Sequence, residues 1–189
     1  MIFTPTPLPG AYIIEPRKIE DERGFFARIL CNDEFAKHDL KLALPQTNMA
    51  RTFRRGTLRG LHFQEPPHAE IKIVRCTKGA IYDVIVDLRP DAPTFKSWFG
   101  LELSEDNFKA LYVPDGFAHG YLTLADNSEI YYHTSKSYHP ASATGVRYDD
   151  PEFEICWPIG ISVVSRQDRE WPDFATRKVS ITSDKEMAQ

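Results

Sequence analysis

The stretch IKIVRCTKGAIYDVIVDLR, residues 71–89, decides the fold class of this chain. It predicts two strands joined by a turn at residues 78–79, because apolar residues dominate both halves and the second half alternates between two faces. In that alternation Asp83 and Asp87 fall on the face opposite Tyr82. The stretch therefore indicates a β-rich protein.

Other segments along the chain have the same character. Short strands are predicted at SWFGLEL (97–103), KALYVP (109–114), GYLTLA (120–125) and EIYYHTS (129–135), and one short helix at DEFAKHDL (33–40). Short strands with Pro, Gly, Asn and Asp turns are typical of an all-β sandwich or jelly roll with a few peripheral helices. The 189 residues carry no linker or repeat, so we expect one domain, with a flexible tail at residues 175–189.

Composition excludes several classes of partner. The formal net charge is -4 and the sequence pI is about 5.9, so no basic field exists to hold nucleic acid or an anionic membrane. The sequence shows no signal peptide and no apolar run that reaches the roughly 18 residues of a membrane span. Three scattered cysteines indicate neither disulfides nor a thiolate zinc site. We expect a cytoplasmic protein.

Two histidine motifs could carry chemistry. TLRGLHFQEPPHAEIKIVRC, residues 57–76, places imidazoles and cations among apolar residues, which suggests a ligand cleft, although a lone histidine such as His62 is more often structural. VPDGFAHGY, residues 113–121, resembles the second motif of the cupin superfamily and ends near His119. The H-x-H pair that a metal-binding cupin shows is missing, because Phe63 and Gln64 follow His62, so we expect no metal site.

Two later segments are ambiguous when taken alone. EIYYHTSKSY carries Tyr131, Tyr132 and Tyr138, and phenols on a strand are more often packing residues than acids. SRQD, residues 165–168, brings Asp168 after a Trp-Pro turn, where an isolated aspartate is usually a surface residue.

Taken together and in order, the motifs resemble the dTDP-4-dehydrorhamnose 3,5-epimerases. The matching blocks include DERGFFAR (21–28), PQTN (45–48), GTLRGLHFQ (56–64), residues 72–89, GFAHGY (116–121), YYHTSKSYHP (131–140) and the segment from Trp157 to Asp168. The resemblance implies a cupin-type jelly-roll subunit in a homodimer. It also implies that the enzyme inverts C3 and C5 of a nucleotide-linked 4-keto-6-deoxyhexose without a cofactor.

The resemblance also implies roles for individual residues. His62 would be the base, oriented by Asp168, while Lys72 would stabilise the enolate oxygen and Tyr132 would donate a proton from the opposite side. The other residues that match are expected to bind substrate or hold the catalytic groups: Arg59, His119, Asp83, Tyr138, Gln46 and Asn48.

An N-terminal arm, about residues 1–28, is expected to make dimer contacts. The resemblance implies that Arg23 and Phe26 reach a neighbour's site, where they would meet the diphosphate and the base. The type enzymes carry a glutamate where this chain has Arg28, at the base-recognition end of the site.

Four alternatives remain open at this point. The enzyme could invert only C3 or only C5, or use another nucleotide such as a CDP-linked sugar. The chain could instead be a non-catalytic cupin that binds a sugar nucleotide, or a metal-dependent cupin enzyme.

Overall fold

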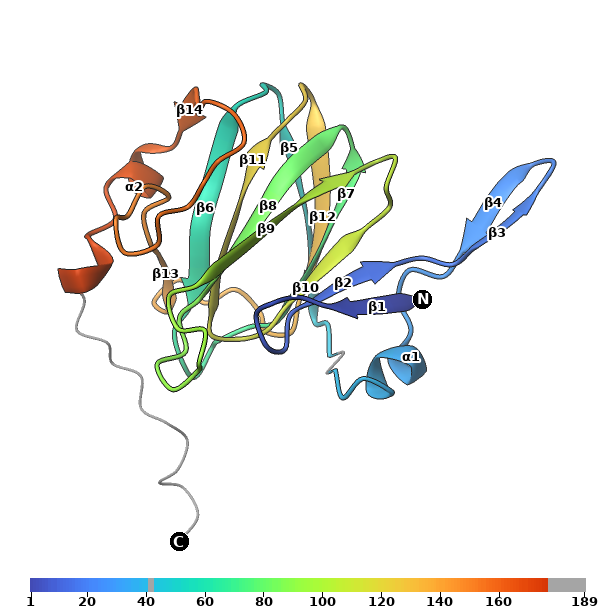
Figure 1. The fold of residues 1–189 in the computed structure, drawn as a ribbon, viewed down its shortest axis with the longest axis horizontal. Coiled ribbons are helices and arrows are strands. Elements are labelled where there is room, and N and C mark those ends of the chain that lie inside the picture. The colour runs from blue at the N-terminus through green and yellow to red at the C-terminus, as the bar shows by residue number, and fades with distance from the viewer. Residues whose placement is uncertain (41–42, 177–189) are drawn as a thin grey trace, which may run out of the picture.

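The computed structural model describes residues 1–40 and 43–176, and strands dominate it (Figure 1). One sheet has the order β1 (Ile2–Pro5), β2 (Tyr12–Glu15), β10 (Ala110–Val113), β7 (Lys72–Lys78), β12 (Ser128–Thr134) and β5 (Gln46–Thr52). The other has the order β13 (Ala143–Gly145), β6 (Thr57–Gln64), β11 (Phe117–Thr123), β8 (Ala80–Asp87) and β9 (Trp98–Ser104), with β14 (Val163–Val164) beside β6. This arrangement confirms the predicted cupin-type jelly roll.

The predicted strands are confirmed, and the predicted helix is shorter than expected. Each strand expected between residues 71 and 135 overlaps one of β7 to β12. Helix α1 covers only Asn32–Ala36, and Asp39 follows it with a left-handed φ of 57°, which a regular helix cannot continue through. Phe35 on α1 is fully buried and meets the edge of Phe3, so packing holds this short helix in place.

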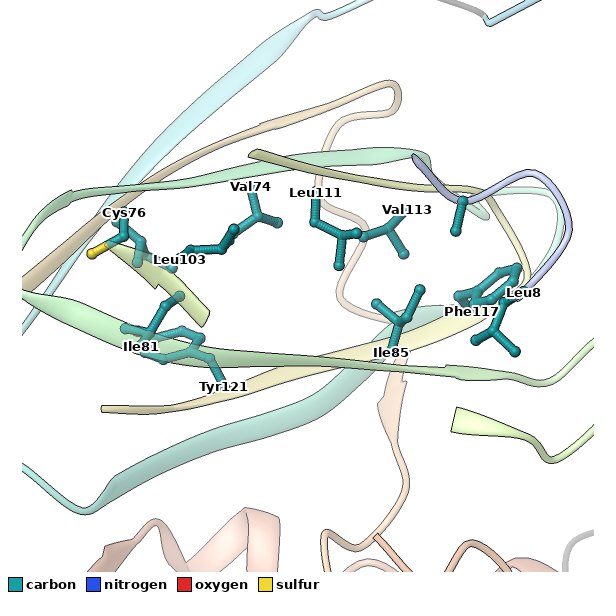
Figure 2. Close-up of a cluster of buried hydrophobic side chains, with 12 residues drawn as sticks. Leu8, Val74, Cys76, Ile81, Ile85, Leu103, Leu111, Val113, Phe117 and Tyr121 are labelled. Atoms are coloured by element: carbon teal, nitrogen blue, oxygen red, sulfur yellow. The ribbon is translucent and has the colours of Figure 1, made fainter. Parts of the chain in front are cut away.

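An apolar cluster joins the two sheets. Figure 2 shows Val74 and Leu111 of the first sheet facing Ile81 and Ile85 of the second. Each of these side chains is fully buried, and burial of such a side chain contributes about 1.5–3 kcal/mol to stability. Tyr121 belongs to this cluster and also lines the cavity described below, so the core supports the cavity wall directly.

The outer face of the second sheet is covered by the C-terminal part of the chain. Val84 and Val86 pack there in a second cluster with Phe153 and Phe174. Helix α2 (Arg166–Arg169) and the short helix η1 (Phe174–Thr176) belong to this segment. The predicted tail begins within η1, and its remaining residues, 177–189, lie outside the described part of the chain.

The strands β3 (Lys18–Asp21) and β4 (Gly24–Ala27) form a separate hairpin that projects from the barrel (Figure 1). Its apolar side chains are largely open to solvent, with Ile19 70% and Phe26 69% exposed. In residues 1–40 and 43–176, no helix is long and apolar enough to cross a membrane.

Candidate active site

A cavity of about 580 Å³ collects most of the predicted site residues. Its wall takes side chains from both sheets and from α2. Nine of the thirteen predicted residues line it: Gln46, Asn48, Arg59, His62, Lys72, His119, Tyr132, Tyr138 and Asp168.

His62 and Asp168 form a pair in this wall although they are far apart in sequence. His62 Nε2 lies 2.6 Å from Asp168 Oδ1. The imidazole is 47% exposed while the carboxylate side chain is 4% exposed, so the ring faces the cavity and the acid stands behind it. With the carboxylate accepting from Nε2–H, Nδ1 is the nitrogen left to take a proton.

Ser165 and Gly60 fix the position of Asp168. Ser165 caps α2, and its hydroxyl accepts a hydrogen bond from the Asp168 N–H at 3.0 Å. The Gly60 N–H donates to Asp168 Oδ2 at 3.3 Å. Gly60 has a φ of 130°, and a Cβ there would lie 2.5 Å from the Gly120 Cα, so only glycine permits this approach of β6 to β11.

The environment keeps Asp168 ionised. Burial alone would raise its pKa, but the hydrogen bond and charge of His62 and the N–H of Gly60 outweigh burial and hold the pKa below its usual value. An ionised carboxylate fixes the imidazole tautomer and stabilises the imidazolium that proton uptake creates.

Lys72 supplies a cation to the same cavity. Its Nζ donates to the His62 carbonyl at 3.0 Å and lies 3.2 Å from Glu70 Oε1. Burial lowers the pKa of Lys72, while the charges of Glu70 and Asp83 act in the opposite direction.

A second imidazole–carboxylate pair lies deeper in the wall. His119 Nε2 lies 2.8 Å from Asp83 Oδ1, and Asp83 is fully buried. Asp83 therefore does not line the cavity itself but supports His119 from behind. The strand alternation read from the sequence placed Asp83 on the face opposite Tyr82, and the structure confirms this, because Tyr82 packs with the outer cluster.

The tyrosines of β12 and the following loop differ in whether they line the cavity. Tyr132 lines the cavity, and burial followed by the charge of Glu70 raises its pKa, so the phenol keeps its proton. Tyr131, one residue earlier, is 42% exposed and does not line the cavity. Tyr138 lies at the cavity with 64% of its surface exposed, and its N–H donates to Gln46 Oε1 at 3.0 Å.

Arg23, Phe26 and Arg28 do not line the cavity of their own chain. Arg23 and Phe26 belong to the projecting hairpin, where the Arg23 Nε donates to Asp21 at 3.2 Å. Arg28 pairs with Glu34 at 3.3 Å, away from the His62 side chain. The roles predicted for these three residues require a second chain and stay predictions.

Sequence analysis missed several residues of the wall. Tyr121 lies two positions after His119 on β11, and period-two strand geometry could have indicated it. Glu70 lies in the loop before β7, where strand alternation gives no signal. Trp171 gave no comparable signal, because it follows α2 in a segment without periodicity.

A metal centre finds no obvious ligands in the part of the chain that the structure describes. No group of three or more His, Cys, Asp or Glu side chains there could hold a metal ion. Whether the reaction needs a cofactor stays a prediction at this point.

Comparisons with known proteins agree with this geometry. A dTDP-4-dehydrorhamnose 3,5-epimerase from Methanothermobacter thermautotrophicus is 40% identical over 89% of this chain and 92% of its own length. A dTDP-4-dehydrorhamnose 3-epimerase from Streptomyces niveus is 36% identical over 90% of this chain and 82% of its own length. The crystal structure of the 3,5-epimerase from Bacillus anthracis, with TDP and PPi bound, has a TM-score of 0.87 and 40% identity over 90% of this chain and 98% of that one.

The family model for dTDP-4-dehydrorhamnose 3,5-epimerase matches residues 5–176, which is nearly all of the described chain. The chain belongs to the dTDP-4-dehydrorhamnose 3,5-epimerase family.

Proposed function

We propose that this protein inverts C3 and C5 of a dTDP-linked 4-keto-6-deoxyhexose. The observation that carries the proposal is the His62–Asp168 pair at 2.6 Å, which shares one cavity with Lys72 and Tyr132. The ketone at C4 acidifies the hydrogens on both neighbouring carbons, so one cavity can serve both centres.

Each inversion needs a neutral base, a cation and a proton donor. His62 Nδ1 takes the proton from carbon and becomes an imidazolium that Asp168 stabilises. The electron pair moves onto the C4 oxygen, where the Lys72 ammonium stabilises the enolate. Tyr132, which keeps its proton because burial raises its pKa, donates that proton to the opposite face of the carbon. His62 then releases its proton to water and the Tyr132 phenolate takes one from water, which restores both groups before the next inversion. The steps transfer only protons, so we expect the reaction to need neither a redox cofactor nor a metal.

Solvent deuterium exchange tests this function. With dTDP-4-keto-6-deoxyglucose in deuterated water, the enzyme should place deuterium at both C3 and C5 and release a product with both centres inverted. The measurement is proton NMR of the recovered sugar nucleotide. Sugar that comes back without deuterium at either carbon would show that the protein only binds the ligand, and a product labelled at C3 alone would match the activity named for the Streptomyces niveus relative.

The nucleotide part of the proposal rests on a relative. The Bacillus anthracis structure contains TDP, which supports a thymidine nucleotide for this chain as well. Arg28 replaces a glutamate of the type enzymes at the base-recognition end of the site, so the same exchange measurement on a CDP-linked 4-keto sugar tests which of the two nucleotides the enzyme uses.

We also propose a homodimer whose sites are shared. The projecting hairpin supports this proposal, because Phe26 is 69% exposed and the Arg23 side chain 83% exposed on an arm that lies outside its own cavity. Light scattering at micromolar concentration should give the mass of two chains.

A mixing experiment makes the shared site testable. Chains that carry H62N should be inactive, and chains that carry R23A should bind substrate weakly. A mixed dimer would pair the intact His62 of one chain with the intact Arg23 of the other, so mixing should restore activity at low substrate concentration. If the activity after mixing is only the average of the two variants, each site is built within one chain.

We expect the enzyme to act in the cytoplasm.

A further inference from the structure

Glu70 is a buried carboxylate that the proposed reaction does not use. It lines the cavity two residues before Lys72, and its side chain is 6% exposed. Its Oε1 lies 3.2 Å from Lys72 Nζ, whereas Oε2 is closed off from solvent and has no hydrogen-bond partner within residues 1–40 and 43–176. A buried charge is unfavourable unless an opposite charge compensates it, and here Lys72 provides that charge.

Lys72 depends on Glu70 in the same way. Its side chain is 10% exposed, and its ammonium has two close polar partners in the described chain, the His62 carbonyl and Glu70. The carbonyl orients the ammonium but carries no net charge. Glu70 is therefore the charged group that touches Nζ, and its carboxylate opposes the lowering of the Lys72 pKa by burial.

Other titratable or charged groups belong to four other strands: His62 and Arg59 on β6, His119 on β11 and Tyr132 on β12 line the same cavity, and Asp83 on β8 lies behind His119. Asp83 also favours the ammonium, but its carboxylate is already bonded to His119 at 2.8 Å. Tyr132 shares the inward face of the sheet with Lys72, because Thr134 is the register partner of Lys72 and Tyr132 that of Val74. Its phenol is neutral, since burial raises its pKa.

We propose that Glu70 is a positioning residue that keeps the Lys72 ammonium charged and held at the cavity wall, where it stabilises the enolate oxygen. The inference rests on the function proposed above. Because Oε2 is closed off from solvent, Glu70 acts through Lys72 and not by contact with the substrate.

The test is the pH profile of kcat in Glu70→Gln, with solvent deuterium exchange as the assay. The amide retains an oxygen that can accept from Nζ but removes the negative charge, so Lys72 should lose its proton at lower pH. On the side of the profile where activity falls as pH rises, E70Q should therefore have about tenfold less activity than the wild type at the same pH. Glu65→Gln is the matched control. Glu65 is exposed at the start of the loop between β6 and β7, so its replacement should leave the pH profile unchanged.

A second measurement separates Lys72 from Tyr132, whose pKa Glu70 also raises. Acetic anhydride acetylates a lysine only when its amine is neutral. Labelling of Lys72 at a series of pH values, measured by mass spectrometry, therefore reports the protonation of Lys72. The labelling curve of E70Q should move to lower pH than that of the wild type. If E70Q does not fold, Glu70→Asp provides the same test, because retracting the carboxylate weakens the same interaction and should shift the curve in the same direction by less.

The outcomes distinguish this inference from the proposed function. A wild type that exchanges no deuterium contradicts the function itself. A wild type that exchanges normally, together with an E70Q variant whose pH profile and labelling curve coincide with those of the wild type, overturns the role of Glu70 alone.

Discussion

Replacing His62 by Asn is expected to reduce kcat by about 10²- to 10⁴-fold, the range that removal of a general base produces. The amide can still donate a hydrogen bond to the ionised Asp168 carboxylate, but it cannot take a proton from carbon. The measurement is solvent deuterium exchange at C3 and C5, followed separately by NMR. Because one imidazole is proposed to serve both carbons, exchange at both should fall together.

His119 makes this experiment discriminating. The cavity is also lined by His119, which pairs with the buried Asp83 behind it. The side chains of His119 and Asp83 are 9% and 0% exposed, whereas the His62 side chain is 47% exposed. The difference in exposure identifies His62 as the imidazole that substrate can reach. Exchange that persists at one carbon in H62N would show that His119 is the base for that carbon.

His68→Asn provides the matched control for H62N. His68 lies six residues further along the chain and stacks on His139 with ring centroids 3.8 Å apart, and it does not line the cavity. H68N should therefore keep kcat near that of the wild type. A similar loss in both variants would indicate a general disturbance of this segment in place of a lost base.

The fold could be predicted because strand periodicity is a local signal. The alternation in residues 80–88 placed Asp83 on the face opposite Tyr82, and the strands expected from residue 71 to 135 are all present. Periodicity gave no signal where contacts with distant residues determine the conformation of a segment. Strand β14 has two residues and exists because it pairs with β6. Asp168 reaches His62 from a capped helix of four residues. The S-x-x-D spacing of Ser165 and Asp168 is typical of a helix N-cap, but such a local pattern does not indicate which distant side chain the carboxylate meets.

The candidate site was also predicted only in part. The family resemblance identified nine residues that the structure brings into one cavity. Glu70 could not be predicted from strand alternation, because it lies in the loop before β7, which begins at Lys72. The hairpin residues Arg23 and Phe26 lie outside that cavity, and the roles predicted for them in a second chain stay predictions.

Replacing Asp168 by Asn is expected to lower kcat by about 10²-fold or more while leaving KM close to that of the wild type. The amide cannot stabilise the imidazolium, and it can present its own N–H to Nε2, which would place the imidazole proton on Nδ1, where the base must be free. Asp173→Asn is the matched control. Asp173 lies in the same segment and its side chain is 49% exposed where it pairs with Arg147. Equal losses in D168N and D173N would contradict the role of Asp168.

The same variant should change how stability depends on pH. The folded-state pKa of Asp168 is lowered from the model-peptide value of 3.8, because the His62 contacts and the Gly60 N–H outweigh the cost of burial. A lowered pKa contributes stability that is present above 3.8 and is lost as pH falls toward the folded-state value. Thermal unfolding of the wild type should therefore lose more stability than D168N as the pH falls below about 4. Parallel curves for the two proteins would mean that the folded state does not favour the ionised carboxylate. In that case His62 would lack the partner that makes it a base.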